Sequence, residues 1–454
     1  FRRVLFRSLI QQQRSTEAVA VLTEVVALQP DSADAHFNLG TACSALGQFE
    51  SAARHFDRAA ALRPGFAAAH LALGNALKAA RDPDAAEDAY RKALSQDPQS
   101  AEAFYNLGNL CLQLGRGEEA VDSYRRAVEL RPSFVAAHSD YVYALNFVPG
   151  ASPEMVFDAH REWARQHAEA LTAVAAPVDG DFSPDRPLRI GYVSPNFRDH
   201  AVSYFFESVL ARHDRRAFHT VCYSDVLYGD AVTERLKQAA GSWHDCAGDS
   251  DDRLAERIRA DRIDILVDLT GHTERNRLLV FARRPAPVQI NYQIFPGTLA
   301  LPCFDYLIAD RIVAPPEHAA HYSEQIVYLP DCYQVTDSRR GAVGPAPSRA
   351  ECGLPEGAFV FCCFSNNYKI TPAFFDIWMR LLNNVAGSVL WLFEDNADAS
   401  ANLRREATAR GIDAQRLVFA PRMDLEHHMA RHRCADLFLD TLPCCAHKIG
   451  RAHV

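Results

Sequence analysis

Small, aromatic and proline positions recur every 34 residues along the first third of the chain. Four classes of position keep this step: Pro30, Pro64, Pro98 and Pro132; Gly40, Gly74 and Gly108; Phe56, Tyr90 and Tyr124; and Ala35, Ala69, Ala103 and Ala137. The pattern predicts pairs of antiparallel helices, in which small residues let the helices approach and an aromatic ring fills the gap. Proline ends each pair because it cannot continue a helix.

A period of 34 residues is the length of a tetratricopeptide (TPR) unit, which buries its apolar face only by stacking on a neighbouring unit. The sequence predicts full units at 33–66, 67–100 and 101–134, preceded by a broken repeat at 9–32 and followed by one more helix from Ser133. We therefore expect a TPR superhelix over 9–150, an α-helical solenoid of the kind that binds extended polypeptide.

The pattern changes after Pro149-Gly150. Residues 152–172 have the period of an amphipathic helix, and the Ala-, Pro- and Asp-rich stretch 175–187 is typical of a linker. Short β-rich runs then alternate with helical periods: strands are predicted at 189–194, 219–224, 263–269, 288–294 and 306–309, and helices at 201–213, 230–240 and 251–260. This alternation indicates a parallel sheet with helices on both faces.

A second series of the same kind follows the Pro-, Gly- and Ala-rich stretch 341–348. Its strands are predicted at 359–365, 388–393, 416–420 and 435–440. Two doubly wound α/β lobes in tandem place ligand sites at the carboxyl ends of their strands. We expect a connecting helix and linker at 151–182, a first lobe at 183–345 and a second lobe at 346–447.

Both ends of the chain carry residues that we expect to be foreign to the fold. Residues 3–8 and 449–454 can be encoded by strings that are reverse complements over most of their length and that resemble a sequencing adaptor. We therefore set 1–8 and 448–454 aside. On this interpretation the natural protein continues past His447, and the second lobe is incomplete.

Composition narrows the classes of function. The chain has 454 residues, 48% of them hydrophobic, and no apolar run long enough to span a membrane. Its formal net charge of −9 argues against nucleic acid as the main partner. The 12 cysteines include no CxxC pair, so we expect buried free thiols in a reducing compartment rather than a disulfide framework.

Polar residues that follow predicted strands are the candidates for chemistry. In the first lobe these are His200, Asp268 and His272. His200 lies between a strand and a helix, where an imidazole can take or donate a proton, and its position equally fits a histidine of a surface loop. For Asp268, at the end of an apolar strand, position alone favours a structural hydrogen-bond acceptor.

In the second lobe, Asn366-Asn367-Tyr368-Lys369 lies between a strand and a helix. An ammonium group and backbone N–H groups at a helix N-terminus together suit a phosphate. The predicted helix 424–432 adds His428 and Arg431, which share a face, and the last strand leads to His447. These segments predict a diphosphate site.

A metal site is not expected. The Asp249-x-Asp251 pair resembles the Asp-x-Asp motif of metal-dependent sugar transferases, but it begins a helix, where acids are common as caps.

The sequence resembles the family of TPR-bearing glycosyltransferases that contains O-linked N-acetylglucosamine transferase and SPINDLY. The likeness extends from the repeats to His447 and is most specific in Gly191-Tyr192-Val193-Ser194 with His200, and in the segments 269–273, 282–289, 366–369, 426–431 and 435–441. It implies a GT-B architecture of two Rossmann-like lobes. It also implies an inverting, metal-independent transfer of a sugar from a nucleotide diphosphate to Ser or Thr hydroxyls of proteins.

The resemblance further implies a role for each candidate residue. On the donor side, Lys369 would neutralise the leaving diphosphate beside Asn366. His428 and Arg431 would hold the nucleotide, the backbone near Met423 would touch the base, and His447 would open a turn that cradles the phosphates.

The resemblance places three residues on the acceptor side. These are His200, the candidate general base, together with Asp268 and His272.

We thus expect a cytoplasmic protein O-glycosyltransferase that uses a nucleotide sugar, UDP-GlcNAc before others, and no further cofactor. Its partners would be protein acceptors held in the TPR groove by residues such as Asn38, Asn75 and Asn106, with neither nucleic acid nor membrane. Two alternatives stay open: GDP-fucose as the donor, and a TPR scaffold whose α/β region only binds. Because part of the nucleotide lobe would be missing, we expect little activity from the chain as written.

Overall fold

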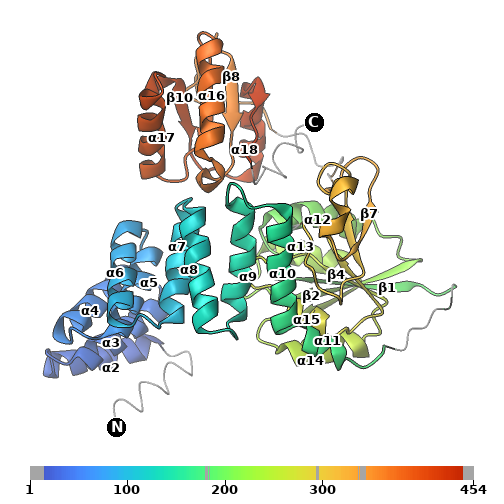
Figure 1. Ribbon diagram of the computed structural model, residues 1–454, viewed down its shortest axis with the longest axis horizontal. Helices are drawn as coiled ribbons and strands as arrows, with labels where there is room; N and C mark the ends of the chain where they lie inside the picture. The colour runs from blue at the N-terminus through green and yellow to red at the C-terminus, as the bar shows by residue number, and fades with distance from the viewer. Residues whose placement is uncertain are drawn as a thin grey trace. The chain divides into compact units, whose positions relative to one another are not determined.

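The computed structural model describes residues 15–178, 183, 185–292, 296–335, 337 and 344–442 (Figure 1). The chain divides into one compact unit that ends at Ala144 and a second that begins at Leu145. Within the described ranges, no helix combines the length and the apolar character that crossing a bilayer requires.

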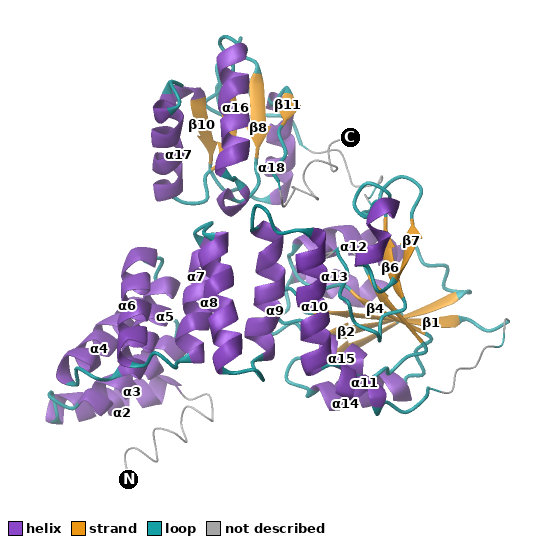
Figure 2. Ribbon diagram, in the orientation of Figure 1, coloured by secondary structure: helices purple, strands orange, loops and turns teal. Residues whose placement is uncertain are grey.

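The first unit is a succession of helices (Figures 1 and 2): α2 (Ser15–Leu28), α3 (Ala33–Ala45), α4 (Phe49–Leu62), α5 (Ala67–Ala79), α6 (Pro83–Gln96), α7 (Ala101–Gln113), α8 (Gly117–Leu130) and α9 (Val135–Ala144). The pairs α3–α4, α5–α6 and α7–α8 are the three full repeats that the 34-residue period predicted. Capping side chains fix where helices begin, because the hydroxyls of Ser32 and Ser100 accept hydrogen bonds from the amides of Ala35 and Ala103.

One contact recurs in every pair: the glycine of the first helix lies against the aromatic ring of the second. A Cβ atom added at these glycines would lie 2.5–2.8 Å from the nearest ring atom, and the rings are at most 3% exposed; the pairs are Gly40 with Phe56, Gly74 with Tyr90, and Gly108 with Tyr124. Two helices can pack this closely only where no side chain separates them. The periodic glycine and aromatic positions are therefore two halves of one contact.

Asn75, which we expected to line a groove for acceptors, is bound inside its own repeat. Tyr90 Oη donates to Asn75 Oδ1 at 2.8 Å, and Tyr124 Oη donates to Asn109 Oδ1 at the same distance. Asn75 and Asn109 occupy the same position of successive repeats, and both orient a buried tyrosine. The acceptor-binding role stays a prediction for Asn38 and Asn106, whose side chains are half-buried and outside these pairs.

The second unit begins with α10 (Pro153–His167) and α11 (Glu169–Ala173), followed by a sheet in the order β3-β2-β1-β4-β5-β6-β7. Its strands are all parallel: β1 (Leu188–Ser194), β2 (Phe218–Ser224), β3 (Ser242–Asp245), β4 (Ile265–Asp268), β5 (Val288–Asn291), β6 (Tyr306–Ala309) and β7 (Gln325–Tyr328). The helices are α12 (Ala201–Ala211), α13 (Ala231–Ala239), α14 (Asp251–Ala260) and α15 (Leu278–Ala282). The sequence did not predict the two edge strands β3 and β7.

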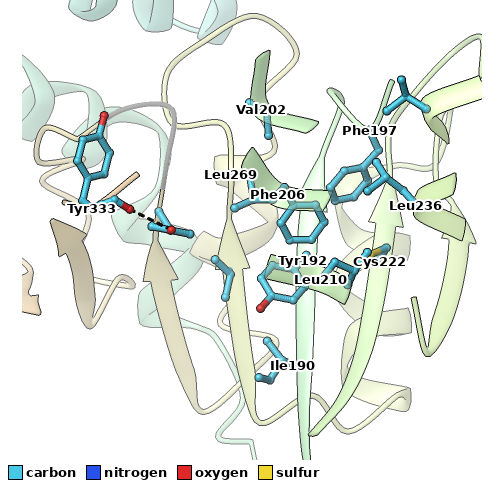
Figure 3. Packing of buried hydrophobic residues seen from close by; sticks show 13 residues of the cluster. Ile190, Tyr192, Phe197, Val202, Phe206, Leu210, Cys222, Leu236, Leu269 and Tyr333 are labelled. Atoms are coloured by element: carbon cyan, nitrogen blue, oxygen red, sulfur yellow. Dashed lines mark hydrogen bonds between the residues drawn. The ribbon is translucent and has the colours of Figure 1, made fainter. Parts of the chain in front are cut away.

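The core of this lobe forms between the sheet and two of its helices (Figure 3). Tyr192 of β1 and Cys222 of β2 point to the same face, where Phe206 of α12 and Leu236 of α13 cover them. Within the same cluster, Tyr292 Oη donates to the carbonyl oxygen of Tyr333 at 3.0 Å. Alternate residues of the central strands thus point to opposite faces, as a sheet covered on both sides requires.

A second parallel sheet has the order β10-β9-β8-β11, with strands β8 (Val360–Cys363), β9 (Val389–Phe393), β10 (Leu417–Ala420) and β11 (Leu437–Phe438). Its helices are α16 (Pro372–Asn384), α17 (Ala397–Ala409) and α18 (Leu425–Arg431). Phe361 and Cys363 pack under α16 and α17, whereas Val360 and Cys362 face the opposite cluster, which contains Cys434. Both lobes are therefore open α/β layers.

The contact between glycine and aromatic ring predicts the effect of a single methyl group. We expect Gly74→Ala to destabilise the repeats, because the new Cβ would lie 2.5 Å from the Tyr90 ring. Overpacking of this severity costs about 3 kcal/mol, and the better helix propensity of alanine returns about 1 kcal/mol. Urea unfolding followed by circular dichroism should show a net loss of about 2 kcal/mol.

Gly65→Ala is the matched control, because Gly65 lies between repeats with nothing within 4 Å of an added Cβ. Its effect should stay within about 0.5 kcal/mol. Equal effects of the two substitutions would show that the close approach does not limit stability.

Candidate functional site

Two loops of the first lobe begin side by side at one edge of the sheet. β1 pairs with β4, so that Val193 lies beside Asp268, and the amide of Leu269 donates to the carbonyl oxygen of Val193 at 3.3 Å. In a parallel sheet the carboxyl ends of neighbouring strands meet at the same edge. The loop that leads to His200 and the turn that leads to His272 therefore start from adjacent strand ends.

His200 is the N-cap residue of α12. Its Nδ1 accepts a hydrogen bond from the amide of Val202 at 3.2 Å, and the ring is half-buried. Because Nδ1 accepts, the proton of the neutral ring lies on Nε2. Both interpretations of the sequence describe this position, because His200 caps a helix and also lies beyond the end of a strand.

Asp268 closes a tight turn below the surface. Its side chain is fully buried, and its carboxylate accepts from the amides of Gly271 at 2.6 Å and Thr270 at 3.2 Å. Gly271 has φ +58°, which glycine adopts without strain. Burial raises the pKa of Asp268 to about 7, and the two backbone N–H groups oppose that rise. This geometry makes Asp268 the acceptor that shapes the turn.

His272 is clamped by helix α10. The His272 side chain is fully buried, with ring centroids 4.8 Å from His160 and 4.9 Å from Trp163, both edge to face. α11 adds a second attachment, because Thr172 Oγ1 donates to the carbonyl oxygen of Ala282 at 2.9 Å. His272 thus joins the turn after β4 to α10 and is covered by that helix.

His160 contributes to this clamp as a neutral ring. It has no exposed surface, and its Nδ1 bonds to the carbonyl oxygen of Val156 at 2.7 Å within the helix. Burial lowers its pKa to about 4. The ring therefore carries no charge near neutral pH.

In the second lobe, Asn366 and Lys369 follow β8. Asn366 is exposed and donates to Tyr368 Oη at 3.2 Å, and Lys369 ends the short 3-10 helix η3 (Asn367–Lys369) immediately before α16. Thr371, the N-cap residue of α16, donates from its hydroxyl to the carbonyl oxygen of Leu442 at 3.4 Å. The segment after β11 therefore reaches the N-terminus of α16, where Lys369 also lies.

Arg431, the last residue of α18, is a buried cation near the same edge of the second sheet. Its side chain reaches back from α18, so that Nη1 donates to the carbonyl oxygen of Pro421 at 2.7 Å, and its guanidinium lies 4.7 Å from the centroid of the Phe364 ring. The residue is 1% exposed, and among the described residues no carboxylate forms an ion pair with it. Burial lowers its pKa.

The arginine also sets the orientation of His428. Arg431 Nη2 lies 2.6 Å from His428 Nδ1, and because a guanidinium only donates, Nδ1 must accept and the ring proton lies on Nε2. The His428 and Phe364 rings meet edge to face, with their centroids 5.3 Å apart. Met423, in the loop before α18, is 39% exposed.

Phe364 is the residue that sequence reasoning missed. It directly follows β8 and contacts both His428 and Arg431, so it joins the loop containing Lys369 to α18. An aromatic side chain at the end of a strand, just before a polar loop, was the available signal. His447 lies outside the described residues.

Both lobes thus present their candidate residues at the carboxyl edge of an open parallel sheet, as nucleotide-dependent transferases of the doubly wound class do. The sequence profile of glycosyl transferase family 41 matches residues 169–342 and 345–452, and that of the tetratricopeptide repeat matches 3–67, 44–77 and 71–133. The chain therefore belongs to glycosyl transferase family 41, with the GT-B fold that the sequence led us to expect.

Similar proteins agree with this assignment. The solved structure of a Thermobaculum terrenum O-GlcNAc transferase mutant has a TM-score of 0.80 and 34% identity, covering 91% of this chain and 79% of that one. The probable UDP-N-acetylglucosamine–peptide N-acetylglucosaminyltransferase SPINDLY of Solanum lycopersicum is 34% identical over 69% of this chain. The enzyme SEC of Arabidopsis thaliana, which bears the same probable activity in its name, is 36% identical over 58%. The chain spans about a third of the length of these curated relatives.

The buried His160 predicts a pH effect. Its folded-state pKa of about 4 is below the unfolded value of about 6.5, so protonation favours the unfolded chain. Its contribution to stability is complete above pH 6.5 and is lost as the pH falls towards 4, by about 3 kcal/mol. His160→Phe should therefore flatten the acid limb of stability measured by urea unfolding between pH 7 and 4.

His318→Phe, at an exposed ring of the same lobe, is the control for loss of a histidine. A parallel acid limb in His160→Phe and the wild type would contradict the assignment of a neutral, buried clamp.

Proposed function

We propose that this chain comprises the TPR and transferase regions of a protein O-glycosyltransferase. It would move a sugar, GlcNAc from UDP-GlcNAc, to Ser or Thr hydroxyls of protein acceptors with inversion and without a metal. The observation that carries the proposal is the buried guanidinium of Arg431, which supports an anion site at the strand edge of the second lobe.

The argument from Arg431 is electrostatic. Removing a guanidinium from water costs several kcal/mol unless partners replace its hydration. Arg431 has a carbonyl oxygen, an imidazole nitrogen and the face of Phe364, none of which carries a negative charge. A nucleoside diphosphate bound beside His428 would supply the negative charge that these partners lack. Because the surroundings of Arg431 have a low dielectric constant, its positive charge would attract the diphosphate strongly.

Lys369 would supply the second positive charge. It precedes the N-terminus of α16, where Pro372 occupies the first turn and backbone N–H groups point outwards. A diphosphate leaving group gains negative charge in the transition state, and an ammonium at that place stabilises it. The donor loop with Asn366, the base contact near Met423 and the phosphate turn at His447 belong to the same proposal.

A metal is not needed in this scheme. The carboxylates of the Asp249-x-Asp251 pair are held in ion pairs, Asp249 with Arg253 and Arg257, and Asp251 with Arg277 at 2.9 Å. Carboxylates held by guanidinium groups are poor candidates for a cation site. This supports a reaction in which protein cations, and no further cofactor, neutralise the diphosphate.

The acceptor would be a protein. The names of similar proteins specify peptide N-acetylglucosaminyltransferases, and the TPR unit offers a surface for extended polypeptide remote from the chemistry. On the first lobe, His200 would face the acceptor hydroxyl as the candidate base, while Asp268 and His272 would hold the neighbouring turn. The ten cysteines of the described part are free thiols, which supports a reducing, cytoplasmic location.

Nucleotide binding tests the donor site. We expect His428→Ala to weaken UDP binding roughly tenfold to a hundredfold, the equivalent of ~1.5–3 kcal/mol for a hydrogen bond to a charged group. Isothermal titration of the full-length natural protein with UDP and with GDP measures this and also separates the two donors. Tighter binding of GDP would favour the fucosyl donor.

His427→Ala is the matched control, because the neighbouring His427 is exposed and pairs with Asp424 at 2.7 Å instead. It should bind UDP like the wild type. If neither nucleotide bound the wild type, the chain would be a TPR scaffold and the proposal would fail.

Lys369→Ala tests the transition-state role. We expect kcat to fall by a factor on the order of 10²–10³, ~2.7–4 kcal/mol, with little change in the KM for the acceptor peptide. Steady-state kinetics with UDP-GlcNAc would be measured in the full-length natural protein, beside Lys92→Ala, a substitution on the surface of the repeats. A change confined to the acceptor KM would assign Lys369 another task.

A further inference from the structure

Two thiols far apart in the sequence meet in the second lobe. Cys434 ends the short 3-10 helix η5 (His432–Cys434), is 5% exposed, and donates from Sγ to the carbonyl oxygen of Pro347 at 3.1 Å. Cys352 is half-buried and packs against the same apolar cluster, and its amide donates to the carbonyl oxygen of Ser348 at 3.2 Å, next to the Pro347 carbonyl that Cys434 contacts. The other described cysteines are also free thiols.

The backbone on the Cys352 side is held in place. Residues 348–354 form a turn in which the amide of Leu354 donates to the carbonyl oxygen of Arg349 at 2.8 Å. The Arg349 guanidinium then bonds to the carbonyl oxygen of Ala358 at 2.7 Å and to Asp436 Oδ2 at 2.8 Å. Asp436 lies just beyond Cys434, so this ion pair holds the two thiol-bearing segments together.

The surroundings set the rate at which these thiols react. The pKa of the Cys352 thiol is raised to about 11, chiefly by burial and to a smaller extent by the neighbouring Cys434 and Glu351, while the charge of Arg431 opposes the rise. A thiolate is the reactive form, so the pair reacts slowly near pH 7 and faster as the pH rises. Cys352 is the more exposed partner and is the first that an oxidant reaches.

We propose that Cys352 and Cys434 form a disulfide when the folded protein meets a hydroperoxide. The Cys352 thiolate attacks the peroxide, the O–O bond breaks, and a sulfenic acid and one water result. The Cys434 thiol then displaces the hydroxyl group, so that the S–S bond forms, the S–O bond breaks and a second water leaves. Two thiols are oxidised, and one hydrogen peroxide is reduced to two waters.

The cross-link would tie the segment that enters the second lobe to η5, which directly follows α18 with His428 and Arg431. It would replace the hydrogen bond from Cys434 to Pro347 with a covalent bond to the turn at 348–354. A bridge between distant residues restricts the unfolded chain, so the oxidised protein should unfold at a higher temperature.

The test is a peptide map of the native chain after treatment with hydrogen peroxide. Cleavage after glutamate and before aspartate releases 352–356 and 427–435, each with a single cysteine. We expect mass spectrometry to find these two fragments joined, in a product that dithiothreitol separates. Its initial rate of formation should rise roughly tenfold per pH unit between about pH 7 and 9, as the thiolate fraction does.

Three serine variants complete the experiment. Cys352→Ser and Cys434→Ser should each abolish the joined fragments and the rise in unfolding temperature, whereas Cys332→Ser, at a half-buried thiol of the first lobe, should leave both unchanged. Cys352→Ser keeps the test valid if loss of the buried Cys434 impairs folding. Fragments joined only after denaturation, or joined preferentially to other cysteines, would overturn the proposal.

Discussion

Parallel strand pairing is the constraint on which the site depends. Every strand pair that the structure describes, in both sheets, is parallel, so each connection must return to the starting edge before the next strand begins. The loops after the strands consequently gather at one edge of each lobe. Residues as distant in sequence as His200 and Asp268, or Lys369 and His428, reach a common edge for this reason alone.

The cost of burying polar groups then decides how these edges are built. Asp268 is covered and compensated by two backbone N–H groups of its own turn. His160 is covered and loses its charge, as its lowered pKa indicates. Arg431 cannot follow either route, because a guanidinium stays protonated and the described partners are neutral. Of these three groups, Arg431 is the one whose cost of desolvation a bound anion would offset.

The sequence predicted the regular parts of this fold because their signals are local. The 34-residue period located the repeats, and apolar runs located β1 and β6 within one residue. It missed β3 and β7, which are edge strands with half-exposed, mixed residues and therefore lack an apolar run. An edge strand is recognised by its neighbour, and that information is tertiary.

The candidate site was predictable by position and not by environment. Strand ends pointed to His200, Asp268, Lys369 and His428, since a strand followed by a polar loop can be seen in one sequence. The burial of His272 could not be foreseen, because it depends on Trp163 and His160 from a helix more than a hundred residues earlier. The burial of Arg431 likewise depends on Phe364, which comes from a different strand.

Burial also separates the tasks of the two cations in the second lobe. Arg431 is fixed by Pro421, His428 and Phe364, so in the proposed reaction its field would stay the same throughout, and it would stabilise bound nucleotide and transition state nearly alike. Such uniform binding changes affinity and leaves kcat almost untouched. Lys369 is half-buried just before α16, where, in the proposed reaction, its ammonium would follow the charge that appears on the departing phosphate. A rate effect therefore requires the more exposed of the two cations.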